Sequence, residues 1–228
     1  MLVGISGDIN SGKDVVGRMF QYLTSDYYKE MYDFEQWLNR VEIYKSDPYS
    51  AIEIKKFADK LKNIVCIMLG CTREQLEDRV FKETPLGEEW WVLTDGIEFT
   101  PYIEGDTRLL DAYNIRVQKT TPRLLMQLAG TDCGRHIIHP NIWVNATMGE
   151  FIPGKSKWAL TDTRFPNEGN AIYQRQGIVL RLERPETDIK DRRNLHESET
   201  ALDLFKFTGI LKNTKDLPYL LDQVKEYV

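Results

Sequence analysis

The residues best suited to chemistry lie near the start of the sequence, where Gly7 and the pair Gly12-Lys13 frame a short polar segment. Their spacing matches the pattern G-x-x-x-x-G-K, in which glycines let backbone N–H groups wrap around phosphate oxygens while the lysine ammonium reaches the outer phosphates. The pattern needs a strand before it and a helix after it, and the apolar run 2–6 and residues 15–20 can supply them. The sequence therefore predicts a loop for the phosphates of a nucleoside triphosphate.

One position departs from this pattern. Asp14 follows the lysine, where a Ser or Thr hydroxyl normally meets Mg²⁺. A carboxylate can hold magnesium directly or through water, or it can merely cap the loop. The residues alone leave both interpretations open.

A second candidate for chemistry is Asp162, which follows the apolar stretch 157–161. An acidic residue at the end of a central strand beside a phosphate loop typically belongs to the magnesium shell, and Arg164 stands two residues further on. The alternative is a helix N-cap followed by a surface arginine. The phosphate loop elsewhere in the chain favours the functional interpretation.

Arginines offer further candidates for binding phosphate. Arg123 and Gln127 are four residues apart in a predicted helix, so they share a face where the guanidinium can clamp a phosphate and the amide can read a base edge. A solvent-exposed pair is the commoner outcome for such residues. The irregular segment 183–200 suits a mobile lid that brings positive charge onto a phosphoryl group, although a charge run is usually a solvated face. Its candidate arginines are Arg184, Arg192 and Arg193.

Histidine and tryptophan give weaker signals. His136 and His139 invite a metal site, but we reject one because no third ligand is evident nearby and Pro140 follows at once. Trp143 and the pair Trp90-Trp91 can stack on a base, yet aromatic residues more often belong to a core.

Strands and helices alternate along the chain, which predicts an α/β fold with a doubly wound, parallel five-stranded sheet and ligands outside the carboxyl ends of the strands. The expected strands are residues 2–6, 52–58, 157–161, 177–182 and 209–213. The expected helices follow the phosphate loop, lie within 24–52, and span 61–69, 122–130, 142–151, 166–176 and the C-terminal residues. Asp59, Asn141 and Asp216 are the expected N-caps, and Gly70 and Gly130 the expected stops.

The stretch 71–118 combines Gly and Pro with many charges, which indicates an insertion over the active site rather than a second core. We find no repeat and no low-complexity linker. The 228 residues are therefore expected to form a single domain, 1–228.

Composition limits the classes of protein. With 42% apolar and 29% charged residues the chain suits a soluble globular protein, and no stretch approaches the roughly 18 apolar residues of a membrane helix. We therefore expect a cytoplasmic location and no membrane partner. A net charge of −5 argues against a nucleic acid polymer as partner but permits a small anionic substrate. Three cysteines without metal-like spacing are expected to be reduced thiols.

Taken together, several segments resemble the phage deoxynucleoside monophosphate kinases, a branch of the P-loop kinases of nucleoside monophosphate kinase type. The similar segments run in order along most of the chain, except for 24–118, where only 57–62 and Lys82 match. They are SG at 6–7, SGKD at 11–14, LMQLAGTD at 125–132, WV at 143–144, TDTR at 161–164, GIV at 177–179, RP at 184–185 and HESE at 196–199.

This resemblance implies transfer of the ATP γ-phosphoryl group to a deoxynucleoside 5′-monophosphate, which yields a diphosphate for DNA synthesis. The family tolerates an aspartate after the loop lysine, its members act in the cytoplasm of the phage host, and some related kinases are homodimers. The residues implied for the ATP phosphates and Mg²⁺ are Gly12, Lys13, Asp14 and Val15, and those implied for the monophosphate are Lys82, Arg123, Gly130, Thr131, Trp143, Asp162 and Arg164. The residue patterns above add Asn10 of the loop for ATP, Gln127 for the monophosphate and Asp162 as a metal ligand beside Asp14. Lys13, Asp162 and Arg164 are the candidates for catalysis.

Two other functions fit the same loop and sheet. One is a P-loop kinase for another small phosphorylated metabolite, whose acceptor pocket would lack an aromatic platform for a base. The other is a non-catalytic module that binds ATP to change shape for a protein partner, since a fold alone does not guarantee chemistry.

Overall fold

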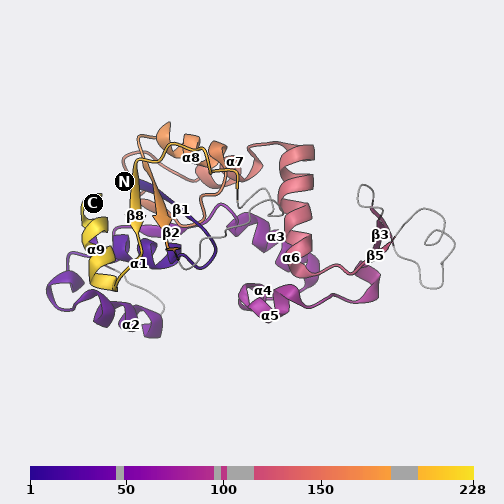
Figure 1. The fold of residues 1–228 in the computed structure, drawn as a ribbon, viewed down its shortest axis with the longest axis horizontal. Helices are drawn as coiled ribbons and strands as arrows, with labels where there is room; N and C mark the ends of the chain where they lie inside the picture. Colours follow the sequence, from indigo (N-terminus) through magenta and orange to yellow (C-terminus); the bar gives the residue numbers. More distant parts are fainter. Residues whose placement is uncertain (45–48, 95–98, 102–115, 186–199) are drawn as a thin grey trace. The chain divides into compact units, whose positions relative to one another are not determined.

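The computed structural model describes residues 1–44, 49–94, 99–101, 116–185 and 200–228 (Figure 1). The chain forms two compact units. Unit 1 comprises Met1–Phe57 and Val144–Val228, and unit 2 comprises Ala58–Trp143. Unit 2 is longer than the insertion expected at 71–118, and the assignment of both units to one kinase domain stays a prediction.

Unit 1 is built on the predicted parallel sheet of five strands. Every neighbouring pair of strands is parallel, which confirms the expected α/β class and doubly wound architecture. The chain lays down two strands on one side of β1 and then crosses to the other side, so β1 is central. In spatial order the strands are β2 (Glu53–Lys55), β6 (Trp158–Leu160), β1 (Leu2–Gly7), β7 (Ile178–Glu183) and β8 (Gly209–Lys212).

Helices cover both faces of this sheet because its strands are apolar on both sides. Along β1, Val3 and Ile5 belong to one apolar cluster, whereas Leu2 belongs to the other. The first cluster is completed by α1 (Lys13–Leu23), α2 (Phe34–Tyr44) and α9 (Leu217–Lys225). The second is completed by α7 (Ile142–Met148) and α8 (Pro166–Tyr173), seen on the opposite side of the sheet in Figure 1.

The helix ends test the predicted caps. Asp216 caps α9 as expected, because its Oδ1 accepts a hydrogen bond of 3.0 Å from the N–H of Tyr219. The cap predicted for α3 (Asp59–Leu69) is wrong: Asp59 is itself the first helical residue, and Ala58 is the N-cap. The Asp59 carboxylate instead lies 3.0 Å from the guanidinium of Arg73, a contact from outside the helix.

Several elements are shorter than predicted. The strand expected at 52–58 covers only β2, which pairs with the three residues of β6. Helix α8 ends at Tyr173 rather than at 176, and the φ of +59° at Gln176 excludes that residue from a helix. Helix α7 ends at Met148 rather than at 151, and 24–52 holds the turn η1 (Tyr28–Glu30) before α2.

Unit 2 contains α3 with α4 (Arg73–Glu77), α5 (Arg79–Glu83) and η2 (Glu88–Trp90). Val65, Cys66 and Leu76 form its small apolar cluster, so the start of the expected insertion does share a core with its neighbours. An antiparallel sheet that sequence patterns missed follows. Its spatial order is β4 (Phe99–Pro101), β3 (Val92–Thr94) and β5 (Arg116–Gln118).

The helix expected at 122–130 begins as predicted but does not end there. Thr121 caps α6 (Pro122–Gln127) by accepting a hydrogen bond from the N–H of Leu124. The chain then continues as a π-helix, η3 (Leu128–Ile138), so Gly130 is not a stop. Its role is close packing instead: a Cβ at Gly130 would lie 2.6 Å from Cδ2 of Leu61.

Residues 186–199 lie outside the described residues. Arg192, Arg193 and the HESE motif fall within them, so the lid expected at 183–200 stays a prediction. Among the described residues, no helix is long and apolar enough to cross a membrane.

Candidate functional site

The phosphate loop has the predicted strand–loop–helix context, since β1 ends at Gly7 and α1 begins at Lys13. Asn10 has φ +64° and Gly12 has φ +103°, the left-handed conformation that a tight anion-binding loop requires. Gly7 also needs to be glycine, because a Cβ there would lie 2.7 Å from the carbonyl oxygen of Leu182. Backbone sterics therefore explain both glycines of the motif.

The Lys13 ammonium contacts the backbone of this loop. Its Nζ donates to the carbonyl oxygens of Gly7, at 2.8 Å, and of Asp8, at 2.6 Å. The Ser11 hydroxyl is buried and has no hydrogen-bond partner among the described residues. A buried polar atom of this kind is costly unless a ligand or water satisfies it, so the loop is suited to a hydrogen-bonding ligand.

Asp14 stands in the first turn of α1 and has two polar partners. Lys56 Nζ lies 2.9 Å from its Oδ1, and the Thr161 hydroxyl donates to the same oxygen at 2.7 Å. Burial raises the pKa of Asp14, but the hydrogen bonds from Lys56 and Thr161 and the charges of Lys56 and Lys13 outweigh burial, so the pKa is lowered. The side chain is 68% exposed, which leaves an ionised carboxylate accessible at the loop.

Asp162 follows β6, as predicted, and ties two strand ends together. Its Oδ1 accepts a hydrogen bond of 2.8 Å from the N–H of Phe57, which follows β2. The alternative that Asp162 caps the next helix is wrong, because Phe165 is the N-cap of α8. Arg164 lies just before that cap, and its N–H donates to Glu168 Oε2 at 2.7 Å. Asp162 and Arg164 thus stand at the carboxyl end of β6, as the functional interpretation requires.

No cluster of three or more His, Cys, Asp or Glu side chains suited to a metal occurs in the described part of the chain. Magnesium is commonly bound through only one or two carboxylates together with substrate phosphates. Asp14 and Asp162 supply carboxylates of this kind, so their residue types fit that mode.

Two predicted monophosphate ligands, Lys82 and Arg123, are neighbours in unit 2. Burial lowers the pKa of Lys82, and the charges of Lys62 and Arg123 act in the same direction, while Glu77 and Glu83 partly offset them. The Arg123 guanidinium contacts Glu83, and Lys62 Nζ lies 2.7 Å from Glu77 Oε1. Cations are therefore gathered here, each with a carboxylate nearby.

The other predicted acceptor residues of unit 2 lie along the helical segment that starts with α6. Gln127 ends α6, and Gly130 and Thr131 are buried in η3. Trp143 is 6% exposed, and its indole N–H donates to the Gly130 carbonyl at 2.7 Å. The indole thus supports the π-helix, which agrees with the alternative that Trp143 belongs to a core.

The weaker signals have local partners. His139 Nδ1 accepts a hydrogen bond of 3.0 Å from the N–H of Asn141, and His136 Nδ1 lies 3.8 Å from Asp132 Oδ1. Trp91 donates from Nε1 to the carbonyl oxygen of Leu86 at 2.9 Å. These contacts account for the side chains without a substrate.

Sequence reasoning missed the residues that brace the phosphate loop. Asn213, just after β8, donates from Nδ2 to the Ser11 carbonyl at 2.8 Å, and Arg181 of β7 forms an ion pair of 2.9 Å with Asp8. Lys56, beside Asp14, was also missed. The available signal was their position, because each is a polar residue at or near the carboxyl end of a strand.

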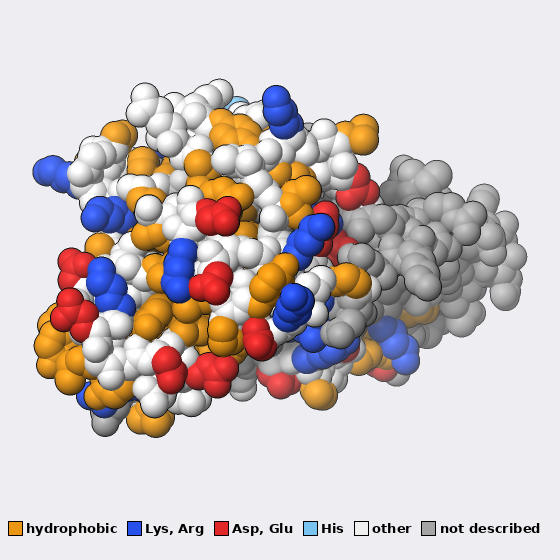
Figure 2. Space-filling view, turned by 60° about the vertical axis from the view of Figure 1, so that its left-hand side comes forward, with side chains coloured by type: hydrophobic (Ala, Val, Ile, Leu, Met, Phe, Trp, Pro, Cys, Tyr) orange, Lys and Arg blue, Asp and Glu red, His pale blue; other side chains and the backbone are white. Residues whose placement is uncertain are grey.

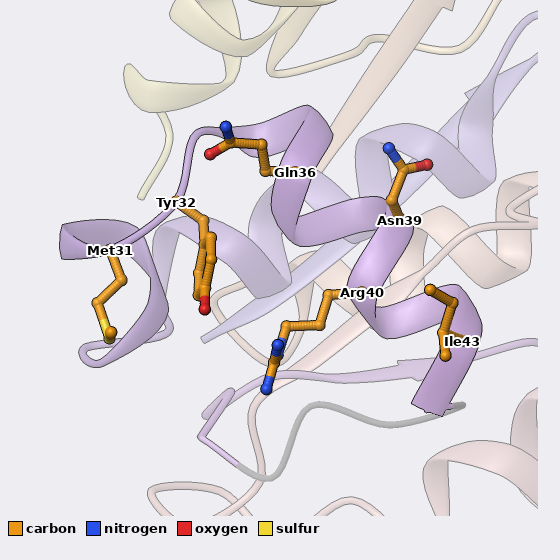
Figure 3. A pocket seen from close by; sticks show the side chains of 6 residues that line it. All are labelled: Met31, Tyr32, Gln36, Asn39, Arg40 and Ile43. Atoms are coloured by element: carbon orange, nitrogen blue, oxygen red, sulfur yellow. The ribbon is translucent and has the colours of Figure 1, made fainter.

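A pocket of about 550 Å³ lies elsewhere on unit 1 and includes none of the predicted site residues. Arg40 stacks over the ring of Tyr32, with 5.6 Å to its centroid. In Figure 3 these two side chains point to one side, whereas Gln36 and Asn39 point to the other. The polar groups therefore do not converge on one ligand. The lining residues are Met31, Tyr32, Gln36, Asn39, Arg40 and Ile43.

One face of the molecule carries charges of both signs. On the face shown in Figure 2, Lys and Arg side chains are interspersed with Asp and Glu. A nucleic acid backbone selects a continuous basic face, and this face is not one.

One comparison with known proteins bears on the family. The deoxynucleoside-5′-monophosphate kinase of Escherichia phage T5 is 25% identical to this chain over 202 residues, which covers 76% of this chain and 72% of the phage protein. No family model matches the chain. The five-stranded parallel sheet with its phosphate loop is the fold expected of a P-loop kinase. The resemblance to the phage deoxynucleoside monophosphate kinases, predicted from the motifs, is thus confirmed by the phage T5 relative.

Proposed function

We propose that this protein is a kinase that transfers the γ-phosphoryl group of ATP to a deoxynucleoside 5′-monophosphate, giving the diphosphate and ADP. The observation that carries the proposal is the loop between β1 and α1, whose carbonyl oxygens accept hydrogen bonds from the Lys13 ammonium. The name of the phage T5 relative supports the choice of acceptor.

The reaction asks for little covalent chemistry from the protein. The attacking oxygen of the monophosphate is already anionic near neutral pH, so no strong general base is required. Positioning and neutralisation of charge should dominate the rate. In this proposal Lys13 moves from the loop carbonyls to the phosphate oxygens, where its charge stabilises the transition state.

Asp14 and Asp162 are the proposed magnesium ligands, and Asn10, Gly12 and Val15 complete the proposed ATP contacts. Asp14 suits this role because its lowered pKa keeps it ionised and its side chain is exposed. Bound magnesium would neutralise charge on the phosphate oxygens. Thr161 and Lys56 would orient the Asp14 carboxylate through the hydrogen bonds that they donate to it.

Lys82 and Arg123 of unit 2 are proposed ligands of the acceptor phosphate, because charge-assisted hydrogen bonds to a phosphate are strong. Arg164 of unit 1 is proposed as a monophosphate ligand on the resemblance to the phage kinases. Gln127 is proposed to read the base edge. Gly130, Thr131 and Trp143 would shape the site through the packing of η3 rather than through stacking on the base.

The direct test is the release of ADP from Mg·ATP with each of dAMP, dGMP, dCMP and dTMP, with the ribonucleotide counterparts, and with no acceptor. Turnover that depends on a deoxynucleotide, together with the matching diphosphate product, is the expected result. ADP release only at the rate without acceptor would refute the proposal. It would favour a kinase for another phosphorylated metabolite or an ATP-gated binding module.

The loop is tested separately by Lys13→Ala. Turnover should fall by at least about a hundredfold with the fold intact, because the lysine charge matters most in the transition state. Lys29→Ala is the control, since Lys29 is an exposed lysine of unit 1 that forms a surface ion pair with Asp26. Near-normal turnover of Lys13→Ala would contradict the role assigned to the loop.

A further inference from the structure

A carboxylate lies within the loop proposed to bind a polyanion. Asp8 is the first residue after Gly7, and only 6% of its surface is exposed. An unpaired negative charge at this depth would repel phosphate and would itself be costly to bury. The loop can serve as a phosphate site only if this charge is neutralised.

Arg181 supplies the opposite charge from the neighbouring strand. It lies opposite Ser6 in the register between β1 and β7, which directs it to the end of β1. Its Nη2 is 2.9 Å from Asp8 Oδ1, and its Nη1 donates to the Ser6 hydroxyl at 3.4 Å. The guanidinium also lies over the ring of Phe207, at 6.0 Å from the centroid. The Arg181 guanidinium thus has three contacts that fix its position, with Ser6, Asp8 and Phe207.

The same aspartate connects this ion pair to the loop lysine. The backbone carbonyl of Asp8 accepts hydrogen bonds from Lys13 Nζ, at 2.6 Å, and from the N–H of Ser11, at 3.2 Å. Holding the Asp8 side chain therefore also holds the carbonyl around which the loop turns and on which Lys13 rests.

We propose that Arg181 is a positioning residue of the nucleotide site. It neutralises the Asp8 carboxylate and fixes the first turn of the loop, so that Lys13 and the loop N–H groups meet the phosphates without repulsion from Asp8. This inference rests on the proposed function, because it assumes that the loop binds ATP. It assigns to Arg181 a role that acts through Asp8 and not through contact with the nucleotide.

The test compares Arg181→Met, Arg181→Lys and the double variant Asp8→Asn/Arg181→Met. Mg·ATP affinity is measured by calorimetry, followed by kcat and KM. Arg181→Met should weaken ATP binding about 20-fold, the size expected for one uncompensated charge roughly 8–10 Å from a phosphate at an effective dielectric constant of about 20. The loss should appear mainly in the KM for ATP.

Arg181→Lys, which keeps the charge, and the double variant, which removes the carboxylate, should both bind ATP within about threefold of wild type. Arg175→Met is the matched control, because Arg175 follows α8 and its guanidinium donates to the Ala171 carbonyl at 3.0 Å. Its ATP affinity should equal that of wild type.

Each other outcome is informative. A double variant as weak as Arg181→Met would overturn the inference, because it would mean that the guanidinium contacts the nucleotide or only supports the fold. Unchanged binding in Arg181→Met would also overturn it. If Arg181→Met does not fold, the double variant and Arg181→Lys decide in the same way. Wild-type protein that binds no ATP would instead refute the proposed function.

Discussion

Gly17 offers a test in which helix propensity and tertiary packing predict opposite signs. It lies in the second turn of α1, where alanine is normally preferred to glycine by about 1 kcal/mol. A Cβ on Gly17, however, would lie 2.5 Å from Cγ2 of Thr161 and 3.5 Å from Cδ1 of Ile54. We predict that Gly17→Ala destabilises the protein.

The size of the effect follows from the rigidity of Thr161. This residue is β-branched, 2% exposed, and held by the hydrogen bond that its hydroxyl donates to Asp14. Overpacking against such a side chain costs about 1–3 kcal/mol. Subtracting the gain of about 1 kcal/mol in propensity leaves a net loss of about 1 kcal/mol in the free energy of unfolding.

The assay is urea denaturation of wild type, Gly17→Ala, Thr161→Ser and the double variant, with hydrogen exchange of the α1 amides as a local probe. Thr161→Ser removes the clashing methyl group but keeps the hydroxyl, at a cost of about 1 kcal/mol for the buried methyl. In that background Gly17→Ala should stabilise by up to about 1 kcal/mol. The expected coupling energy is therefore about 2 kcal/mol.

The reasoning is refuted if Gly17→Ala stabilises the wild-type protein by about the same amount as it stabilises Thr161→Ser. That result would mean that the sheet yields to the added methyl and that glycine is not required for packing at this position.

Three further predictions concern single contacts. Trp143→Phe should lower the free energy of unfolding by about 1–3 kcal/mol, because it leaves the buried Gly130 carbonyl without its hydrogen-bond donor. A loss below about 0.5 kcal/mol in chemical denaturation would contradict this. The pKa of Asp14 is lowered in the folded protein, so its ionised carboxylate stabilises the fold above the unfolded pKa of 3.8, and this stabilisation is lost as the pH falls through the lower folded pKa. Lys56→Met should therefore reduce the free energy of unfolding by less than about 1 kcal/mol near pH 6, and near pH 2 variant and wild type should be equally stable. A constant difference across that range would remove the ion pair as its cause. Asp162→Asn retains an acceptor for the N–H of Phe57, so it should fold normally but need at least about tenfold more magnesium for half-maximal turnover, and an unchanged magnesium titration would exclude Asp162 from the metal shell.

The features that the sequence predicted correctly depend on residues close together in the chain. The glycines and lysine at 7–13, the apolar strand before them, the helix start at Pro122 and the cap Asp216 each depend on a few neighbouring residues. Alternation of apolar strands with helices likewise predicted the parallel sheet. Local sterics, hydrogen bonds within one turn and hydrophobic periodicity leave recognisable patterns because few conformations satisfy them.

The wrong predictions arose where a distant residue changed a local preference. Asp59 resembles an N-cap, but Arg73 binds its carboxylate. Gly130 resembles a helix stop, but Leu61 packs where its side chain would be and the helix continues. No pattern within either segment reports the partner that decides its conformation.

The sequence by itself determined that this protein has a phosphate loop on a parallel α/β sheet, because that motif is contiguous and its conformation is set by backbone sterics. Only the tertiary structure decided which side chains support the loop. Asp162 meets Phe57 across 105 residues of chain, and Arg181 meets Asp8 across 173. Such pairs depend on strand order and register, which follow from the packing of the whole sheet and are encoded in no single segment.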